Sequence, residues 1–86
     1  MLKNLYQLSS ATLPSALSLV TEHDAVLFRQ DSCYLIQSAH QWPTQQLFAL
    51  KDDMTFRQLA APANVTLIDD LEWVNLCVVA QRVISC

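Results

Sequence analysis

Residues 25-AVLF-28 decide the fold class, because a short unbroken apolar run is typical of a β-strand that is covered on both faces. Similar runs follow in 47-LFAL-50 and 64-NVTLIDD-70, and an extended segment, 2-LKNLYQL-8, precedes them. Helical spacing of apolar residues marks the intervening segments, which are residues 13–20, 33 to about 40, 52 to about 59 and 70 to about 82. We therefore predict one α/β domain over residues 1–86, a layered fold whose mostly parallel sheet of four to five strands is flanked by short helices.

The chain of 86 residues contains no glycine. Turns that need a positive φ must then be made by other residues, at some conformational cost. We expect His23 to take the glycine-like position in the reversal 22-EHD-24, and Thr12 to cap the helix that begins with Leu13 and Pro14. A glycine-rich phosphate loop is also missing, which argues against the usual kinds of nucleotide binding.

Composition favours a subunit of an assembly. Hydrophobic residues make up 52% of the chain, which is more apolar surface than so small a domain can bury alone, so we expect an oligomeric interface. The net charge is −3 and the five basic residues are scattered, so we predict no direct nucleic-acid binding. No window approaches the roughly 20 apolar residues of a membrane span, and the first residues do not resemble a signal peptide, so we expect a cytoplasmic protein.

The cysteines are Cys33, Cys77 and Cys86, and the two histidines are His23 and His40. An odd number of cysteines without a CxxC pair predicts free thiols rather than disulfides or a structural zinc site. We expect no metal and no cofactor.

Cys33 is the candidate for chemistry. It follows a buried strand and a turn in which Asp31 or Ser32 would cap a helix, and a helix N-terminus lowers the pKa of a thiol. The charge of Asp31 would oppose the thiolate, and the spacing of Cys33, Ile36 and Ala39 is typical of a buried helix face. A persulfide-carrying thiol and an inert packed thiol are therefore both consistent with the residues.

Two groups of acidic residues are candidates for chemistry or for helix capping. Asp52 and Asp53 follow the strand 47–50, where carboxylates could bind a cation, act as acid and base, or cap the next helix. Asp69 and Glu72 are spaced as a capping box for the last helix.

The last helix carries two apolar stripes. One consists of Leu71, Val74 and Val78, and the other of Trp73, Cys77 and Ala80. A helix that covers one sheet needs only one stripe, so the other is either additional core or a surface for a partner. We take Trp73, Cys77 and Ala80 as the candidate partner interface, since tryptophan is enriched in binding hot spots.

Four segments taken together resemble the TusB/DsrH family, the smallest subunit of the sulfur-relay complexes TusBCD and DsrEFH. They are MLKNLYQL, DAVLFRQDS, FALKDDMTFRQL and LIDDLEWVNLCVVAQRVISC, and they cover nearly the whole chain. The most specific features are Gln30 and Asp31 after the strand, and an ending that is similar to LIDxxxFVxLxV. That ending is filled here by Leu67, Ile68, Asp69, Trp73, Val74, Leu76 and Val78.

The resemblance implies a small α/β subunit that assembles with two related subunits resembling TusC and TusD, as a dimer of heterotrimers. Such a complex receives persulfide sulfur from small carrier proteins and passes it toward 2-thiolation of the tRNA wobble uridine. In sulfur-oxidising bacteria the counterpart serves dissimilatory sulfur metabolism.

The resemblance also implies where thiols would be needed. The sulfur-carrying cysteine of the active subunit corresponds to the neighbourhood of residues 51–53, and a second cysteine of some relatives to residues 15–17; neither segment contains a thiol here. Relatives usually have a small apolar residue in place of Cys33. We therefore expect a non-catalytic structural subunit that serves tRNA thiolation. The alternatives are a sulfurtransferase that carries persulfide on Cys33, or a subunit of a dissimilatory sulfur-oxidation complex.

Overall fold

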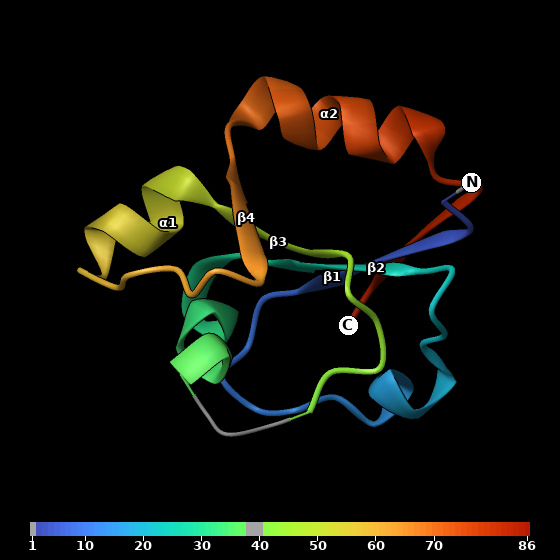
Figure 1. Cartoon of the computed structure of the whole chain (residues 1–86), viewed down its shortest axis with the longest axis horizontal. Coiled ribbons are helices and arrows are strands. Elements are labelled where there is room, and N and C mark those ends of the chain that lie inside the picture. Colours follow the sequence, from blue (N-terminus) through green and yellow to red (C-terminus); the bar gives the residue numbers. More distant parts are fainter. Residues whose placement is uncertain (1, 38–40) are drawn as a thin grey trace.

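Five parallel strands form one sheet in the computed structural model, which describes residues 2–37 and 41–86 (Figure 1). The strands are β1 (Asn4–Leu8), β2 (Ala25–Phe28), β3 (Leu47–Leu50), β4 (Val65–Ile68) and β5 (Arg82–Ser85). Their order across the sheet is β4-β3-β2-β1-β5, and every neighbouring pair is parallel. The predicted α/β class with a mostly parallel sheet is confirmed, as are the four strands expected from the apolar runs.

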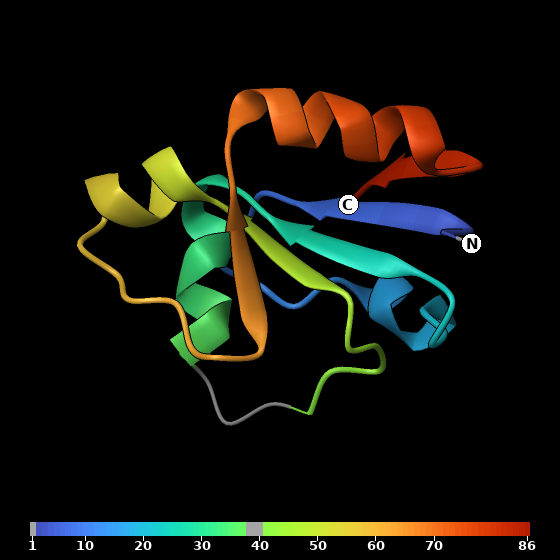
Figure 2. The same cartoon turned by 45° about the horizontal axis from the view of Figure 1, so that its top comes forward.

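Four short helices connect the strands within residues 2–37 and 41–86. They are the 3-10 helices η1 (Ser15–Leu19) and η2 (Gln30–Gln37) and the α-helices α1 (Lys51–Phe56) and α2 (Asp70–Val79). Figure 2 shows α2 on one face of the sheet, with η1 and η2 on the opposite face. None of the helices in the described parts of the chain has the length and apolar character needed to cross a membrane.

The helix predictions need correction at their ends. The first helix is one short 3-10 segment, η1, and its N-cap is Pro14, with no hydrogen bond from a capping side chain. The prediction that Thr12 caps this helix is therefore wrong. η2 begins at Gln30, three residues before the predicted start, and the end predicted for it near residue 40 lies outside the described residues. α1 ends at Phe56 rather than near residue 59.

β5 was not predicted as a strand, because the apolar residues of α2 continue in the sequence toward Arg82 and indicated a longer helix. The helix ends at Val79, and Ala80 is extended with φ −72° and ψ 139°. The backbone N–H groups of Gln81 and Arg82 then donate to the carbonyl of Lys3 at 3.0 and 3.2 Å. These bonds start the pairing of β5 with β1, which makes β1 an interior strand.

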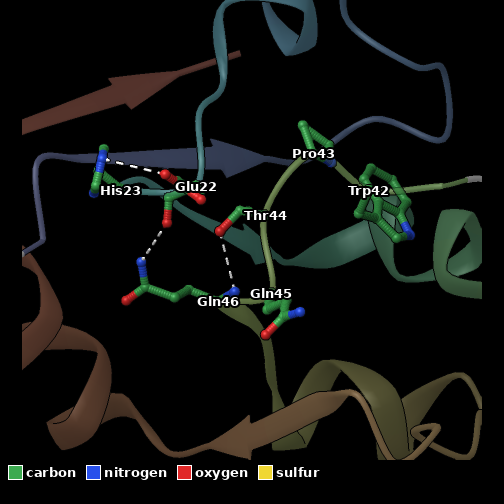
Figure 3. A pocket seen from close by; sticks show the side chains of 7 residues that line it. All are labelled: Glu22, His23, Trp42, Pro43, Thr44, Gln45 and Gln46. Atoms are coloured by element: carbon green, nitrogen blue, oxygen red, sulfur yellow. Dashed lines mark hydrogen bonds and ion pairs between the residues drawn. The ribbon is translucent and has the colours of Figure 1, made fainter.

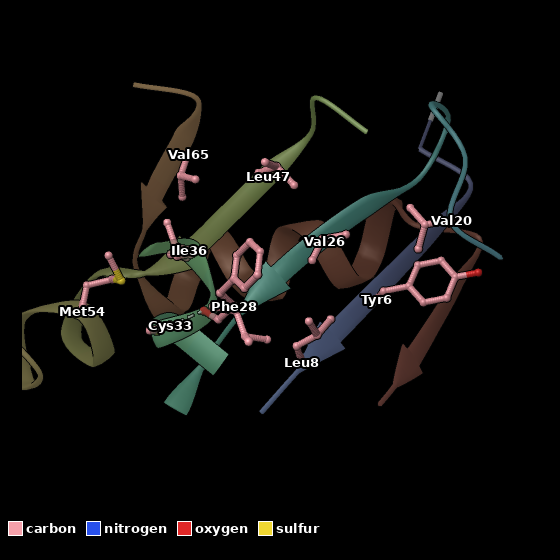
Figure 4. Packing of buried hydrophobic residues seen from close by; sticks show 12 residues of the cluster. Tyr6, Leu8, Val20, Val26, Phe28, Cys33, Ile36, Leu47, Met54 and Val65 are labelled. Atoms are coloured by element: carbon pink, nitrogen blue, oxygen red, sulfur yellow. Dashed lines mark hydrogen bonds between the residues drawn. The ribbon is translucent and has the colours of Figure 1, made fainter. Parts of the chain in front are cut away.

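The sheet has a hydrophobic core on each face. The larger core lies between the sheet and η1, η2 and α1, and its members include Tyr6, Leu8, Val26, Phe28, Cys33, Ile36, Leu47 and Met54 (Figure 4). The smaller core lies under α2 and consists of Leu5, Ala25, Leu27, Leu50 and Ile68. α2 is the only described helix that packs on this second face, so it alone keeps the face from water.

The reversal before β2 is made by Asp24 and not by a left-handed His23. Positive φ among the described residues occurs at Gln30 and Gln58. The buried carboxylate of Asp24 accepts hydrogen bonds from the backbone and side chain of Thr21 at 2.8 and 3.2 Å, and from those of Asn4 at 3.1 and 3.0 Å. Burial alone would raise the pKa of Asp24, but the hydrogen bonds from Thr21 and Asn4 outweigh it and lower the pKa.

We predict that Asp24→Asn lowers the free energy of unfolding at pH 7 by about 2 kcal/mol, since an amide nitrogen cannot accept these hydrogen bonds. Because the pKa of Asp24 is depressed in the folded state, its contribution is present above the pKa of the unfolded state and is lost as the pH falls through the folded-state pKa. The difference between wild type and variant should therefore narrow below about pH 4. Urea unfolding at pH 7 and pH 3 measures this, with the exposed Asp52→Asn as control. A difference that is independent of pH would contradict the prediction.

Candidate functional site

Cys33 lies inside the larger core and not at the start of a helix. Because η2 begins at Gln30, Cys33 lies one turn into the helix on its inner face, where it is 0% exposed. Its Sγ donates a weak hydrogen bond to the carbonyl of Phe28 at 3.8 Å. The helix-terminus geometry that would activate a thiol is therefore not formed around Cys33.

The electrostatic surroundings of Cys33 favour the neutral thiol. Burial, followed by the negative charge of Asp53, raises the pKa of Cys33 to about 11, and Arg57 offsets only part of this increase. At pH 7 about one thiol in ten thousand would be ionised. His23, the histidine whose position is described, lies in the turn before β2, where its Nε2 is 3.6 Å from Glu22. No described histidine is therefore in a position to deprotonate Cys33.

Of the acidic pair after β3, Asp53 connects α1 to η2, whereas Asp52 is exposed. Asp53 accepts a hydrogen bond from the backbone N–H of Gln30 at 2.9 Å, and Arg57 lies 3.0 Å from Asp31 and 3.8 Å from Asp53. Leu50 is the N-cap of α1 and no side chain caps this helix, so the prediction that Asp52 or Asp53 caps it is wrong. No group of three metal-ligating side chains occurs among the residues that the structure describes.

α2 turns its two apolar stripes in opposite directions. Trp73, Cys77 and Ala80 pack against the smaller core and are half-buried. The other stripe is in solvent, where Leu71, Val74 and Val78 are 70%, 56% and 75% exposed. Trp73, Cys77 and Ala80 are thus part of the core contact, and their contact with a partner stays a prediction. The larger free apolar surface belongs to Leu71, Val74 and Val78, which we call the outer stripe.

The start of α2 confirms the predicted capping box. The side chain of Asp69 accepts from the backbone N–H of Glu72 at 2.8 Å, and Glu72 accepts from that of Asp69 at 3.1 Å. These acids stabilise the N-terminus of the helix that carries the outer stripe.

The comparison with protein families agrees with this architecture. A family model described as DsrH like protein matches residues 7–83. The chain belongs to the DsrH-like family. Membership implies that it is a subunit of a sulfur-relay complex. A search of curated proteins found no match.

The other thiols of this DsrH-like chain are half-buried. Cys77 packs from the inner face of α2 against the smaller core, and Cys86 follows β5, where its backbone N–H donates to the carbonyl of Gln7 at 2.9 Å. Burial raises the pKa of Cys86. All three cysteines are free thiols, as predicted.

An open pocket lies at the amino ends of β2 and β3 (Figure 3). It has a volume of about 530 Å³ and is lined by Glu22, His23, Trp42, Pro43, Thr44, Gln45 and Gln46. Its polar groups serve the fold: Thr44 Oγ1 donates to the carbonyl of Asp24 at 2.7 Å, and Gln46 Nε2 donates to the same carbonyl at 3.0 Å. Neither a thiol nor a pair of carboxylates lines this pocket.

We predict that Cys33 resists alkylation in the native DsrH-like chain. A thiol with a pKa near 11 reacts about a hundredfold more slowly than an ordinary thiol at the same pH, and complete burial slows it further. Treatment with iodoacetamide at pH 8 followed by peptide mass spectrometry measures the rate, and Cys77 and Cys86 in the same sample are the comparison. Cys33 should be labelled quickly only in urea. Labelling of native Cys33 as fast as that of Cys77 would contradict the prediction.

Proposed function

We propose that this chain is a non-catalytic structural subunit of a sulfur-relay complex, and that it binds subunits of the DsrE and DsrF type. The observation that carries the proposal is that α2 is apolar on both its inner and its outer face. A helix of this kind is ordinarily buried on both sides. In this chain the sheet covers only the inner face, so a second protein is needed for the outer stripe.

The composition of the outer stripe supports a protein partner. Leu71, Val74 and Val78 carry no charge, and Val79 beside them is 59% exposed. Contiguous exposed apolar surface on a small domain is typical of a protein interface, and the interior of such interfaces is depleted of charged residues. A related subunit that presents its own apolar face fits this surface better than a charged ligand does.

The thiols support the non-catalytic part of the proposal. Sulfur transfer requires a thiolate that can reach a donor and an acceptor, whereas Cys33 is buried and its pKa is raised to about 11. The segment after β3, where the resemblance implies the sulfur-carrying cysteine of the active subunit, consists here of Lys51, Asp52 and Asp53. The persulfide would then be carried by a partner subunit.

We further propose that the complex serves 2-thiolation of the tRNA wobble uridine. A net charge of −3 with only five scattered basic residues fits a subunit that leaves contact with the tRNA phosphates to other components. Dissimilatory sulfur oxidation is the competing process, and the second experiment below separates the two.

The partner surface is tested by the double substitution Leu71→Ser and Val78→Ser. Removing two apolar side chains from an interface should weaken the complex at least about tenfold. Pull-down of co-expressed DsrE-type and DsrF-type subunits measures this. The control is Leu19→Ser, which removes a side chain that is 68% exposed in η1, on the opposite face of the sheet. Equal recovery of partners with the double variant and with wild type would contradict the proposal.

The pathway is tested in a strain that lacks the chain. Deletion should strongly reduce 2-thiouridine in tRNA, measured by mass spectrometry of nucleosides. Cys33→Ala should restore the modification, because the proposed role needs no thiol, whereas the Leu71→Ser and Val78→Ser variant should not.

The other results of this experiment are also decisive. Normal 2-thiouridine together with impaired sulfur oxidation would assign the chain to the dissimilatory pathway. Failure of a folded, partner-binding Cys33→Ala variant to restore thiolation would instead support Cys33 as a persulfide carrier.

A further inference from the structure

Three residues from separate parts of the chain form a cluster: Arg29, Trp73 of α2 and Gln7 of β1. Arg29 directly follows β2, and its Cζ lies 4.9 Å from the centre of a Trp73 ring. The indole is itself held in place, because Trp73 Nε1 donates to Gln7 Oε1 at 3.0 Å. A fixed aromatic ring fixes the plane of the guanidinium that stacks on it. The cluster lies toward the carboxyl ends of β1 and β2, the edge of a parallel sheet where α/β proteins bind ligands.

The positive charge of Arg29 has no partner among the described residues. No described carboxylate lies within ion-pair distance of its guanidinium, and its Nε is fully buried without a hydrogen-bond partner. The two Nη atoms have no hydrogen-bond partner in the described parts of the chain either, but unlike Nε they are not fully buried. They are therefore accessible from the surface. A guanidinium that is partly desolvated and unpaired carries an energetic cost, which an oxyanion would relieve.

Arg57 provides the contrast within the same chain. It also lies near an aromatic ring, with its Cζ 5.6 Å from the centre of Phe56, but its charge is paired with Asp31 and Asp53.

The acids near the same edge of the sheet are engaged elsewhere. Asp31 pairs with Arg57, Asp53 binds the backbone of Gln30, and Asp69 and Glu72 cap α2 together. The remaining two, Asp52 and Asp70, are exposed and form no ion pair with Arg29. The described part of the fold thus supplies an anion to Arg57 and leaves Arg29 without one.

We propose that Arg29, oriented by Trp73 and Gln7, is a binding site for an oxyanion that offers two oxygens to its Nη groups. Carboxylate and phosphate share this chemistry, and a planar guanidinium can bind either through two parallel N–H···O bonds. The net charge of −3 gives the chain no long-range attraction for anions. Recognition would therefore depend on the local geometry of the cluster. This site rests on the contacts of this chain alone and does not depend on the proposed function.

The site is tested by NMR titration of the arginine Nε–H resonances with sodium acetate and, separately, with sodium phosphate, at ionic strength held constant with sodium chloride. Arg29 should shift saturably, with a dissociation constant on the order of tens of millimolar, the range expected for one bidentate charge-assisted pair. The Trp73 Nε1–H resonance should shift with it. Arg57 in the same spectrum is the internal control and should not saturate.

Saturation with acetate alone would identify a carboxylate ligand, and saturation with phosphate alone a phosphate. Saturable shifts with both acetate and phosphate would support a site that binds two oxygens of either anion. Equal, unsaturating shifts at all arginines, or none at Arg29, would overturn the proposal.

Matched variants separate the geometry of the site from its charge. Arg29→Gln should abolish the saturable shift of Trp73, whereas Arg82→Gln, which removes an exposed cation from β5, should leave it unchanged. Arg29→Lys keeps the charge but loses the planar pair of donors, and should weaken acetate binding at least about threefold. Binding by the lysine variant as tight as that of wild type would show a simple point charge and overturn the proposed geometry.

Discussion

The absence of glycine is the constraint on which the rest of this structure depends. A parallel sheet needs reversals at both ends of its strands, and in this chain side-chain carboxylates stabilise two of them. Asp24 holds the turn before β2 through four hydrogen bonds. Asp53 holds the backbone of Gln30, where φ is 52°, by accepting its N–H. The second contact lies at the first residue of η2, the helix that carries Cys33 on its inner face.

A second constraint follows from the order of the strands. The connections through η1, η2 and α1 cover one face of the sheet, and among the described helices only α2 covers the other. One ten-residue helix covers the centre of a five-stranded sheet but cannot cover its flanks. Because α2 is apolar on its outer face too, it is suited to lie between two layers of protein. This is the geometry expected of a subunit whose neighbours complete its core.

The sequence predicted the central part of the fold well, because short apolar runs identify buried strands without knowledge of the tertiary structure. It missed β5, whose residues continue the apolar run of α2 and form an exposed edge strand. It also gave no reliable signal for which stripe of α2 faces the sheet, since both are apolar. Trp73, Cys77 and Ala80, taken from the sequence as the partner interface, pack against the smaller core. The interaction of Gln30 with Asp53, and the cluster of Arg29, Trp73 and Gln7, had no local signal because their members come from separate elements. The spacing of Cys33 and Ile36 did indicate the buried thiol correctly.

The position of β1 inside the sheet has a consequence for how the chain folds. Leu5 pairs with Ala25 on one side and with Val83 on the other, and the second partner is roughly eighty positions away. The hydrogen bond between Gln7 and Trp73 spans nearly the same separation. Contacts of such range close large loops and form late, which slows folding relative to a fold built from local contacts. Until β5 docks, one edge of β1 is unpaired, and an unpaired strand edge is a surface on which other chains can pair.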